Sequence, residues 1–286
     1  MGQEKTRVEF SNLDRILFPD PGISKRQIIE YYIRIAPWML QFLENRPLSL
    51  QRFPRGIDHS GFFEKSVPPG TPEWVDTFSR FHEKGLDSEY ILCNNLDTLL
   101  WLSNLAAIEI NITLSRVPRP GDPDLAFFDI DPKPPACFQD AIDAALILKE
   151  ILDGLAIRSY IKTSGKSGLH VVIPLIEGYS FHQVKNFVHG TGLLMEKQSK
   201  NIRAEFRDSR DAGTVFIDYL QNSAWKTMAC PYSIRPVKGA TVSTPLSWRE
   251  ILEDIKPEDF NVATVISRKG DPWQDIFENR QEIVVK

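Results

Sequence analysis

The chain has 286 residues, with 34 lysines and arginines, 38 aspartates and glutamates, and a formal net charge of −4. This balance argues against a simple nucleic-acid binder, because such proteins usually carry a basic excess. Apolar side chains make up 42% of the residues, which allows a large core and excludes a disordered chain. Three scattered cysteines exclude a disulfide framework, and no segment resembles a membrane span or a signal peptide. We therefore expect a cytoplasmic protein.

The charge is distributed unevenly along the chain. Residues 1–56 hold nine basic and six acidic side chains, whereas residues 57–157 hold seven and seventeen. Residues 158–249 reverse the balance, with thirteen basic and six acidic side chains, and residues 250–286 hold five and nine. An acidic centre between two basic segments is compatible with separate sites for phosphates and for cations.

The first predicted element is a long helix. Ser24 and Gln27 form a capping box, and apolar residues then recur at helical spacing, which predicts a helix over residues 25–44. Alternation over residues 47–53 predicts a short strand. Residues 54–90 are rich in proline, glycine and charge, so we expect loops and short strands there.

Helices and strands alternate through the rest of the chain. Their periodicities predict helices over residues 94–108, 137–155 and 181–198, a last short helix from Ser247, and strands over residues 125–132, 158–163, 169–175 and 214–220. Two glycines within residues 164–168 indicate a hairpin-like loop. The order is typical of an α/β or α+β fold with mixed sheets.

Three aspartates follow apolar runs that are predicted to be strands. Asp129 and Asp131 are two residues apart, so both carboxylates lie on one face of a strand. They repel each other unless a cation lies between them, and Mg²⁺ and Mn²⁺ prefer carboxylate oxygens. Asp218 shares a face with Phe216 and Leu220 on another apolar strand, where a lone acid is costly. The set predicts a two-metal site, although Asp-x-Asp-Pro is also a common turn sequence.

A basic, glycine-rich segment lies between the second and third aspartates. Residues 162–170 offer hydroxyls, glycine N–H groups, lysines and a histidine, which suit phosphate recognition or simply form a solvated turn. The spacing of a Walker A loop is absent. Lys226 and Arg235 continue the basic supply. We interpret His182 and His189, on the helix predicted at 181–198, as surface or packing residues.

Metal-binding carboxylates and a basic loop together favour chemistry on a nucleoside triphosphate. Two divalent ions would bridge phosphate oxygens, activate an attacking hydroxyl and stabilise the pyrophosphate leaving group. A metal-dependent nuclease or phosphodiesterase is the rival enzyme, since it uses the same acids. A non-catalytic module that bridges DNA ends is the rival from another class.

Several motifs occur in a fixed order over nearly the whole chain. They occupy residues 11–15 with 24–25, 62–65, 101–109, 128–132, 163–165 with 168–170, 216–219 and 231–235. In these motifs the chain resembles the polymerase domain of bacterial ligase D, a member of the archaeo-eukaryotic primase superfamily that works in non-homologous end joining. The resemblance implies one domain over residues 1–286, with a primase-polymerase core of mixed or antiparallel sheets flanked by helices. A DNA-end-binding part would cover about residues 1–110, a catalytic part 111–250 and a tail 251–286.

The resemblance also implies roles for individual residues. The metal ligands and catalytic residues would be Asp129, Asp131 and Asp218. The nucleotide-binding residues would be Ser164, Lys166, Ser167, His170, Lys226, Arg235, Asn111 and Arg52. The DNA contacts would be Arg15 and Lys25 for a 5′-phosphate and Phe62 and Phe63 for the template.

Two positions depart from the family pattern. Asn111 stands where the family usually has histidine, and an amide can donate a hydrogen bond but cannot carry charge. In the glycine-rich loop Lys166 precedes Ser167, where the family more often has glycine followed by lysine. Either residue is therefore a candidate for the phosphate contact.

Cofactors and partners follow from the same resemblance. We expect two Mn²⁺ or Mg²⁺ ions, NTPs as substrates with ribonucleotides preferred, and DNA gaps or broken ends that carry a 5′-phosphate; de novo priming stays an alternative. Because the sequence ends at Lys286, we expect separate ligase, phosphoesterase and Ku-type partners and a nucleoid-associated location.

Overall fold

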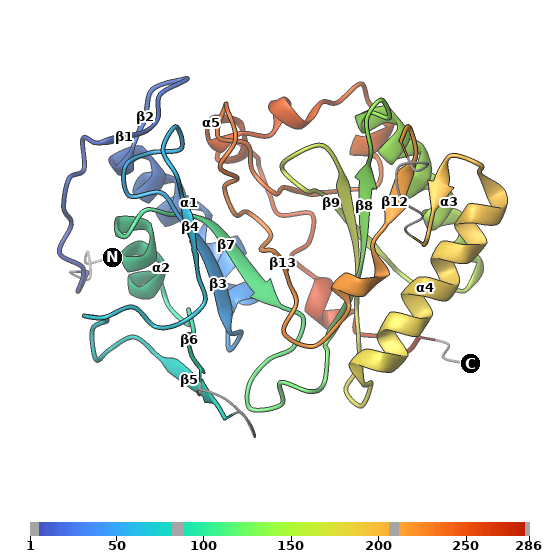
Figure 1. Cartoon of the computed structure of the whole chain (residues 1–286), viewed down its shortest axis with the longest axis horizontal. Helices are drawn as coiled ribbons and strands as arrows, with labels where there is room; N and C mark the ends of the chain where they lie inside the picture. Colours follow the sequence, from blue (N-terminus) through green and yellow to red (C-terminus); the bar gives the residue numbers. More distant parts are fainter. Residues whose placement is uncertain (1–5, 82–87, 206–211, 284–286) are drawn as a thin grey trace.

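Two β-sheets face each other in the computed structural model, which describes residues 6–81, 88–205 and 212–283 (Figure 1). Helices flank the sheets, and most strand pairs are antiparallel. This architecture confirms the mixed α/β fold class expected from the sequence. Among the described residues, no helix combines the length and apolarity needed to cross a membrane.

The larger sheet has six strands in the order β11-β12-β8-β10-β9-β14. Its strands are β8 (Leu125–Pro132), β9 (Tyr160–Thr163), β10 (Leu169–Pro174), β11 (Ile202–Arg203), β12 (Val215–Ile217) and β14 (Pro245–Leu246). Among the described strands of this sheet, β11 and β12 form the one parallel pair. Strand β8 lies inside the sheet, and its apolar run is buried on both faces, as the sequence of a central strand requires.

Two helices cover the outer face of this sheet. They are α3 (Phe138–Gly154) and α4 (Phe181–Gln198), seen to the right of β8 in Figure 1. The Phe128 ring of β8 meets the Phe187 ring of α4 edge-on, with centroids 6.3 Å apart. Because side chains alternate along a strand, Phe127, Asp129 and Asp131 point to the opposite face, toward the second sheet.

The second sheet has four antiparallel strands in the order β13-β7-β3-β4. Its strands are β3 (Leu48–Arg52), β4 (Phe62–Glu64), β7 (Ala107–Thr113) and β13 (Thr227–Ala229). Helices α1 (Lys25–Leu43) and α2 (Leu96–Asn104) pack together beside it. The Tyr32 hydroxyl of α1 donates to the Ile108 carbonyl of β7 over 3.3 Å, which ties the helix to the sheet.

Small elements complete the chain. Two hairpins are formed by β1 (Ile16–Phe18) with β2 (Ile23–Ser24) and by β5 (Thr77–Arg80) with β6 (Ser88–Ile91). In the second half, the described residues form one short helix, α5 (Val262–Val265), and four 3-10 turns, at Tyr219–Gln221, Glu250–Leu252, Pro257–Asp259 and Ile276–Glu278.

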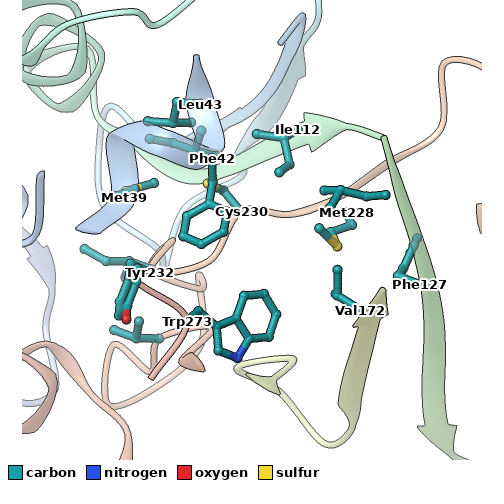
Figure 2. Close-up of a cluster of buried hydrophobic side chains, with 14 of the residues drawn as sticks. Met39, Phe42, Leu43, Ile112, Phe127, Val172, Met228, Cys230, Tyr232 and Trp273 are labelled. Carbon is teal, nitrogen blue, oxygen red and sulfur yellow. The ribbon is translucent and has the colours of Figure 1, made fainter. Parts of the chain in front are cut away.

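An apolar cluster joins the two sheets. Figure 2 shows Phe127 and Val172 of the larger sheet near Met228 of β13, with Phe42 of α1 and Trp273 of the C-terminal segment nearby. The Trp273 ring packs edge-on against Phe42, with centroids 5.9 Å apart. Burial of this cluster holds the sheets in a fixed relation and so sets the width of any cavity between them.

Most predicted elements are present, and the differences have local causes. The capping box at Ser24 and the helix from residue 181 to 198 are confirmed. The helix expected over residues 94–108 ends at Asn104, because Ala106 adopts a left-handed conformation with φ of 58° and β7 begins directly after it. The short helix expected from Ser247 is a 3-10 turn.

The boundary expected near residue 110 falls inside β7. Strand β13, from the segment expected to be catalytic, pairs with β7 and so belongs to the sheet of the N-terminal part. The two halves of the molecule are therefore not two consecutive pieces of sequence.

Candidate active site

A cavity of about 290 Å³ opens between the two sheets. Its lining comes from β7, β13, β8, β10 and the loop after β9, and comprises Glu109, Asn111, Phe127, Asp129, Asp131, Ser164, Lys166, Ser167, His170, Gln221, Thr227, Met228, Ala229 and Arg235. Phe127 and Met228 also belong to the apolar cluster of Figure 2, so the cavity begins where that core ends. The structure thus brings eight predicted nucleotide or metal residues to one cavity.

Strand register explains the position of the aspartates. Asp129 lies opposite His170 of β10, and Asp131 lies opposite Phe216 of β12. The backbone N–H of Asp218 donates to the Asp129 carbonyl over 3.1 Å, so Asp218 continues the same register one step beyond β12. The expected strand over residues 214–220 is shorter than predicted, because Asp218 caps the turn that follows it.

Each carboxylate has a partner in this structure. Asp129 Oδ1 is 3.3 Å from His170 Nε2, and Asp131 Oδ2 is 2.5 Å from Lys133 Nζ. Asp218 accepts hydrogen bonds from the backbone of the next turn and from the Gln221 amide. Within residues 6–81, 88–205 and 212–283, no group of three or more His, Cys, Asp or Glu side chains is arranged to hold a metal ion.

The chemistry of the donor set nevertheless suits a hard divalent ion. Carboxylate oxygens are the ligands that Mg²⁺ and Mn²⁺ prefer. The Lys133 and Asp131 side chains are partly exposed, so rotation can separate them. Asp218 does not line the cavity, and it too has to rotate away from Gln221 to face the other two acids. A coordination sphere therefore needs rotation of side chains, while the backbone register already places the acids on adjacent strands.

Burial and neighbouring charges control the protonation of Asp129 and His170. Burial and the charge of Lys162 lower the pKa of His170 to about 4, so the imidazole is neutral at neutral pH. Burial acts to raise the pKa of Asp129, but the hydrogen bond from His170 and the nearby cations outweigh it and hold that pKa below its ordinary value. Asp129 is therefore ionised, and His170 donates its Nε2 proton to it. His170 Nδ1 is buried without a hydrogen-bond partner among the described residues.

The glycine-rich loop is folded around the Ser164 side chain. Ser164 Oγ accepts from the backbone N–H groups of Lys166, at 3.2 Å, and Gly168, at 3.1 Å. The Arg235 guanidinium donates to the Ser164 carbonyl over 2.8 Å. Gly165 has φ of 74°, and a Cβ there would lie 2.5 Å from Arg235 Cγ, so the loop and Arg235 require glycine at this position.

Arg235 and Asn111 share one acidic partner in the cavity wall. Arg235 Nε lies 3.1 Å from Glu109 Oε2, and the Asn111 amide donates to Glu109 Oε1 over 3.1 Å. Burial and the charge of Arg235 lower the pKa of Lys166. Glu109 therefore offsets part of the positive charge, and Asn111 is oriented without needing a charge of its own.

The structure places Arg52 outside this cavity. Its guanidinium pairs with Glu64 and donates to the Leu105 carbonyl over 3.1 Å. Burial lowers the pKa of Lys25, and the positive charges of Arg15 and Arg52 lower it further, so these three cations lie near one another. Arg52 is therefore grouped with the expected DNA-end residues and not with the nucleotide residues.

Lys25 and Arg15 already bind backbone carbonyls. The buried Lys25 ammonium donates to Ser11 O over 3.0 Å and to Asn104 O over 2.7 Å. Arg15 is exposed and donates one N–H to the Pro54 carbonyl. Lys25 therefore ties the N-terminal segment to the end of α2, whereas Arg15 is exposed to solvent.

Two phenylalanines stand on the edge strand β4. Phe62 is 45% exposed and Phe63 is 63% exposed. The Arg52 guanidinium lies 5.3 Å from the Phe62 ring centroid. Exposed aromatic rings beside a cation are suited to stacking on nucleic-acid bases.

Lys226 is exposed and lies next to Thr227 of the cavity wall without lining the cavity itself. The residue before it, Trp225, is held between the Arg80 guanidinium, at 4.0 Å, and the Tyr90 ring, at 5.3 Å. The β5–β6 hairpin therefore fixes the segment that enters the cavity wall.

The sequence patterns do not indicate a role for three buried polar residues in the cavity wall or next to it. Lys162 lies opposite His170, is fully buried, and donates a hydrogen bond to the Ser243 hydroxyl. Glu109 holds Arg235 and Asn111, and Asn222 binds the backbone of β8. Lys162 is two residues before Ser164, so strand alternation could have indicated that both lie on one face. Asn222 binds Phe127, which is 95 residues away in the chain, and no local pattern reveals this contact.

Comparison with known proteins identifies the family. The family model of the LigD primase-polymerase domain matches residues 24–273. The bifunctional non-homologous end joining protein LigD of Bacillus subtilis is 32% identical over 284 residues, which are 96% of this chain and 45% of the relative. The multifunctional LigD of Mycolicibacterium smegmatis is 31% identical over 251 residues, which are 86% of this chain and 33% of the relative. The chain therefore spans less than half the length of these relatives.

The solved polymerase domain of Mycobacterium tuberculosis ligase D, in complex with DNA, has the same fold. It superposes with a TM-score of 0.89 at 27% identity and covers 97% of this chain and 100% of that chain. Because the family match covers most of the chain, and the fold agrees over nearly all of it, the chain belongs to the LigD primase-polymerase domain family.

Proposed function

We propose that this protein is a DNA-directed nucleotidyltransferase that adds nucleotides to a primer 3′-hydroxyl at gaps and broken DNA ends. The observation that carries the proposal is that one cavity is lined both by the carboxylates of Asp129 and Asp131 and by the cations of Lys166 and Arg235. A triphosphate needs both, since cations bind its oxygens and carboxylates retain the divalent ions that accompany it.

Each side chain has a defined task in this reaction. Asp129, Asp131 and Asp218 would hold two divalent ions, which supply charge to the phosphates and activate the hydroxyl. Lys166 and Arg235 bind the triphosphate directly. The hydroxyls of Ser164 and Ser167, with His170, Asn111 and the nearby Lys226, complete the nucleotide contacts.

Neutral His170 orients Asp129 through its Nε2–H. Its unpaired Nδ1 is an acceptor that a hydroxyl of the bound nucleotide can satisfy.

The DNA end would lie on the N-terminal part. Arg15 contacts the 5′-phosphate, with Lys25 and Arg52 adding positive charge behind it. Phe62 and Phe63 stack on template bases. The preference for ribonucleotides and Mn²⁺ is part of the proposal and is supported by the family resemblance.

The names of the relatives support a role in non-homologous end joining. In that reaction the product of extension is a nicked duplex, which a DNA ligase must seal. We therefore include ligase, phosphoesterase and Ku-type end-binding activities as partners in the proposal.

Primer extension on a gapped duplex with a 5′-phosphate tests the proposal, with Mn²⁺ and either NTPs or dNTPs. We expect wild-type protein to extend the primer with NTPs, and Asp129→Asn and Asp131→Asn to lose the activity. Asp254→Asn, an exposed acid outside the cavity lining, is the charge-matched control. Extension by the two cavity variants at the wild-type rate would refute the metal assignment. Loss of nucleotides without any NTP would indicate a nuclease, and DNA binding without extension would indicate a bridging module.

A further inference from the structure

The segment from Asp218 to Asn222, called the arch below, leaves the larger sheet and returns to it. Strand β12 pairs with β8 up to the Ile217–Ile130 pair, and the Asp218 N–H then donates to the Asp129 carbonyl over 3.1 Å. The turn Tyr219–Gln221 follows and ends the ladder between β12 and β8. The first attachment of the arch to β8 is thus the hydrogen bond at Asp129.

The Asn222 side chain forms the second attachment of the arch to β8. Its Oδ1 accepts from the Phe127 N–H over 3.0 Å, and its Nδ2 donates to the Phe127 carbonyl over 2.7 Å. The amide therefore pairs with Phe127 as a strand residue would, on the edge of β8 that β12 has left. Asn222 is fully buried, so water does not substitute for these two hydrogen bonds.

The two attachments are at alternate residues along one edge of β8. Phe127 and Asp129 present their backbone groups to the same neighbour, because the hydrogen-bonding direction alternates along a strand. The Asp218 carboxylate accepts from Leu220 N over 3.1 Å and from Gln221 Nε2 over 2.8 Å, so it is tied to the segment that leads to Asn222. The position of Asp218 relative to Asp129 is therefore set by the attachment at Phe127 as well as by the one at Asp129.

Helix α4 supports the outer side of the arch. The His189 ring stacks on the Tyr219 ring, with centroids 4.1 Å apart and planes at 22°. His189 Nε2 lies 3.5 Å from Glu205 Oε1. This stacking agrees with the surface or packing role expected for His189, and the residue that it packs on is the neighbour of Asp218.

We propose that Asn222 is a positioning residue for nucleotidyl transfer: it holds the arch on β8 and thereby keeps Asp218 beside Asp129 for the divalent ions. His189 supports the same position from outside. This inference rests on the proposed function, since it assigns a task to Asn222 only if Asp218 takes part in that reaction.

The test compares wild type, Asn222→Ala and a matched control. Asn94→Ala is the control, because the Asn94 amide also binds backbone, accepting from Asn45 N over 2.7 Å, but lies outside the cavity lining. Three quantities are measured: direct Mn²⁺ binding by the loss of the free-ion EPR signal, hydrogen exchange of the Phe127 amide, and steady-state primer extension.

We expect Asn222→Ala to exchange the Phe127 amide faster and to bind Mn²⁺ more weakly. Its kcat should fall about 10-fold to 100-fold, since a displacement of about 1 Å near the reacting atoms has effects of that size. Binding of gapped DNA should stay at the wild-type value, because Arg15 and Phe63 lie on other elements. Asn94→Ala should change none of the Mn²⁺, exchange or kcat values.

The possible results separate the two proposals. If wild type extends primers and Asn222→Ala matches it in Mn²⁺ binding and kcat, the inference is overturned and the proposed function stands. If wild type neither binds Mn²⁺ nor extends primers, the proposed function fails and the inference fails with it. An unchanged Phe127 exchange rate in Asn222→Ala also overturns the inference.

A second pair of variants covers the case in which Asn222→Ala does not fold. His189→Ala removes the ring stack from a partly exposed position, whereas His189→Phe keeps an aromatic ring there. We expect His189→Ala to weaken Mn²⁺ binding and lower kcat, and His189→Phe to restore both. Equal values for His189→Ala and wild type would contradict the support from α4.

Discussion

Gly168 gives the sharpest test of how the nucleotide loop is joined to the acidic strand. A Cβ added at Gly168 would lie 2.3 Å from the Ile130 carbonyl oxygen and 3.3 Å from Pro132 Cδ. Ile130 is the residue between Asp129 and Asp131 on the interior strand β8. The new methyl group would therefore meet a backbone atom of that strand. The carbonyl cannot rotate away as a flexible side chain could.

The size of the displacement follows from the contact distance. A Cβ almost never lies closer than 3.0 Å to another heavy atom, and its ordinary contacts begin at 3.4 Å, so the loop or the strand has to move by 0.7–1.1 Å to relieve a contact of 2.3 Å. Overpacking of this kind costs about 1–3 kcal/mol of folding free energy. A shift of about 1 Å at reacting groups lowers rates about 100-fold.

Gly168→Ala should therefore change both stability and activity. We expect the free energy of unfolding, measured in urea, to fall by about 1–3 kcal/mol. In primer extension we expect a higher KM for the NTP together with a kcat reduced by up to about 100-fold. Gly121→Ala is the matched control, because no atom lies within 4 Å of a Cβ at Gly121.

The comparison of the two glycine variants decides the matter. If Gly168→Ala unfolds and extends primers as Gly121→Ala does, the close contact between the loop and β8 does not govern the site. If it loses stability but keeps its KM and kcat, the contact is structural and the loop does not position the nucleotide.

Four further predictions concern protonation, DNA binding and stability. In metal-free buffer, wild-type stability should rise by up to about 3 kcal/mol between pH 4 and 6.5, because only the unfolded chain protonates His170 there; urea titrations of His170→Phe should lack this rise. Phe63→Ala should leave the unfolding midpoint unchanged and weaken gapped-DNA binding by about 1–3 kcal/mol in fluorescence anisotropy. Arg15→Ala should remove the preference for a 5′-phosphate and reduce the salt slope of binding by about 1. Lys25→Met should also lower stability, since Ser11 and Asn104 carbonyls lose their donor.

The pH prediction and the two DNA-binding predictions can each be contradicted by a specific result. A pH dependence that survives in His170→Phe would mean that other groups cause it. Unchanged DNA affinity in Phe63→Ala would remove the template role of β4, and equal binding of phosphorylated and unphosphorylated gaps by wild type would remove the 5′-phosphate site.

Local sequence patterns predicted much of this molecule because they depend on near neighbours. The capping box at Ser24 is satisfied by a residue three positions away. The pairing of Asp129 and Asp131 on one face follows from strand alternation alone. The glycine-rich loop was identified by residue type, and its glycines do meet close contacts, at Arg235 Cγ and at the Ile130 carbonyl.

Other features depend on contacts between distant segments, and no local pattern contains them. Asp218 was expected on a strand, whereas it follows one, because its carboxylate caps the next turn. Arg52 was expected at the nucleotide, but it lies outside the cavity lining, where it pairs with Glu64 and is near Lys25. These outcomes depend on which strands are neighbours.

Residue type and short-range spacing were sufficient to predict the fold class, the family resemblance and the candidate acids and cations, because they indicate helices, strands and the chemistry of side chains. Three features appear only in the folded molecule: strand register sets Asp218 against Asp129, Arg52 lies outside the cavity lining, and Asn222 and Lys162 are buried. Such features arise from hydrogen bonds and charges that meet only after the two sheets have packed together.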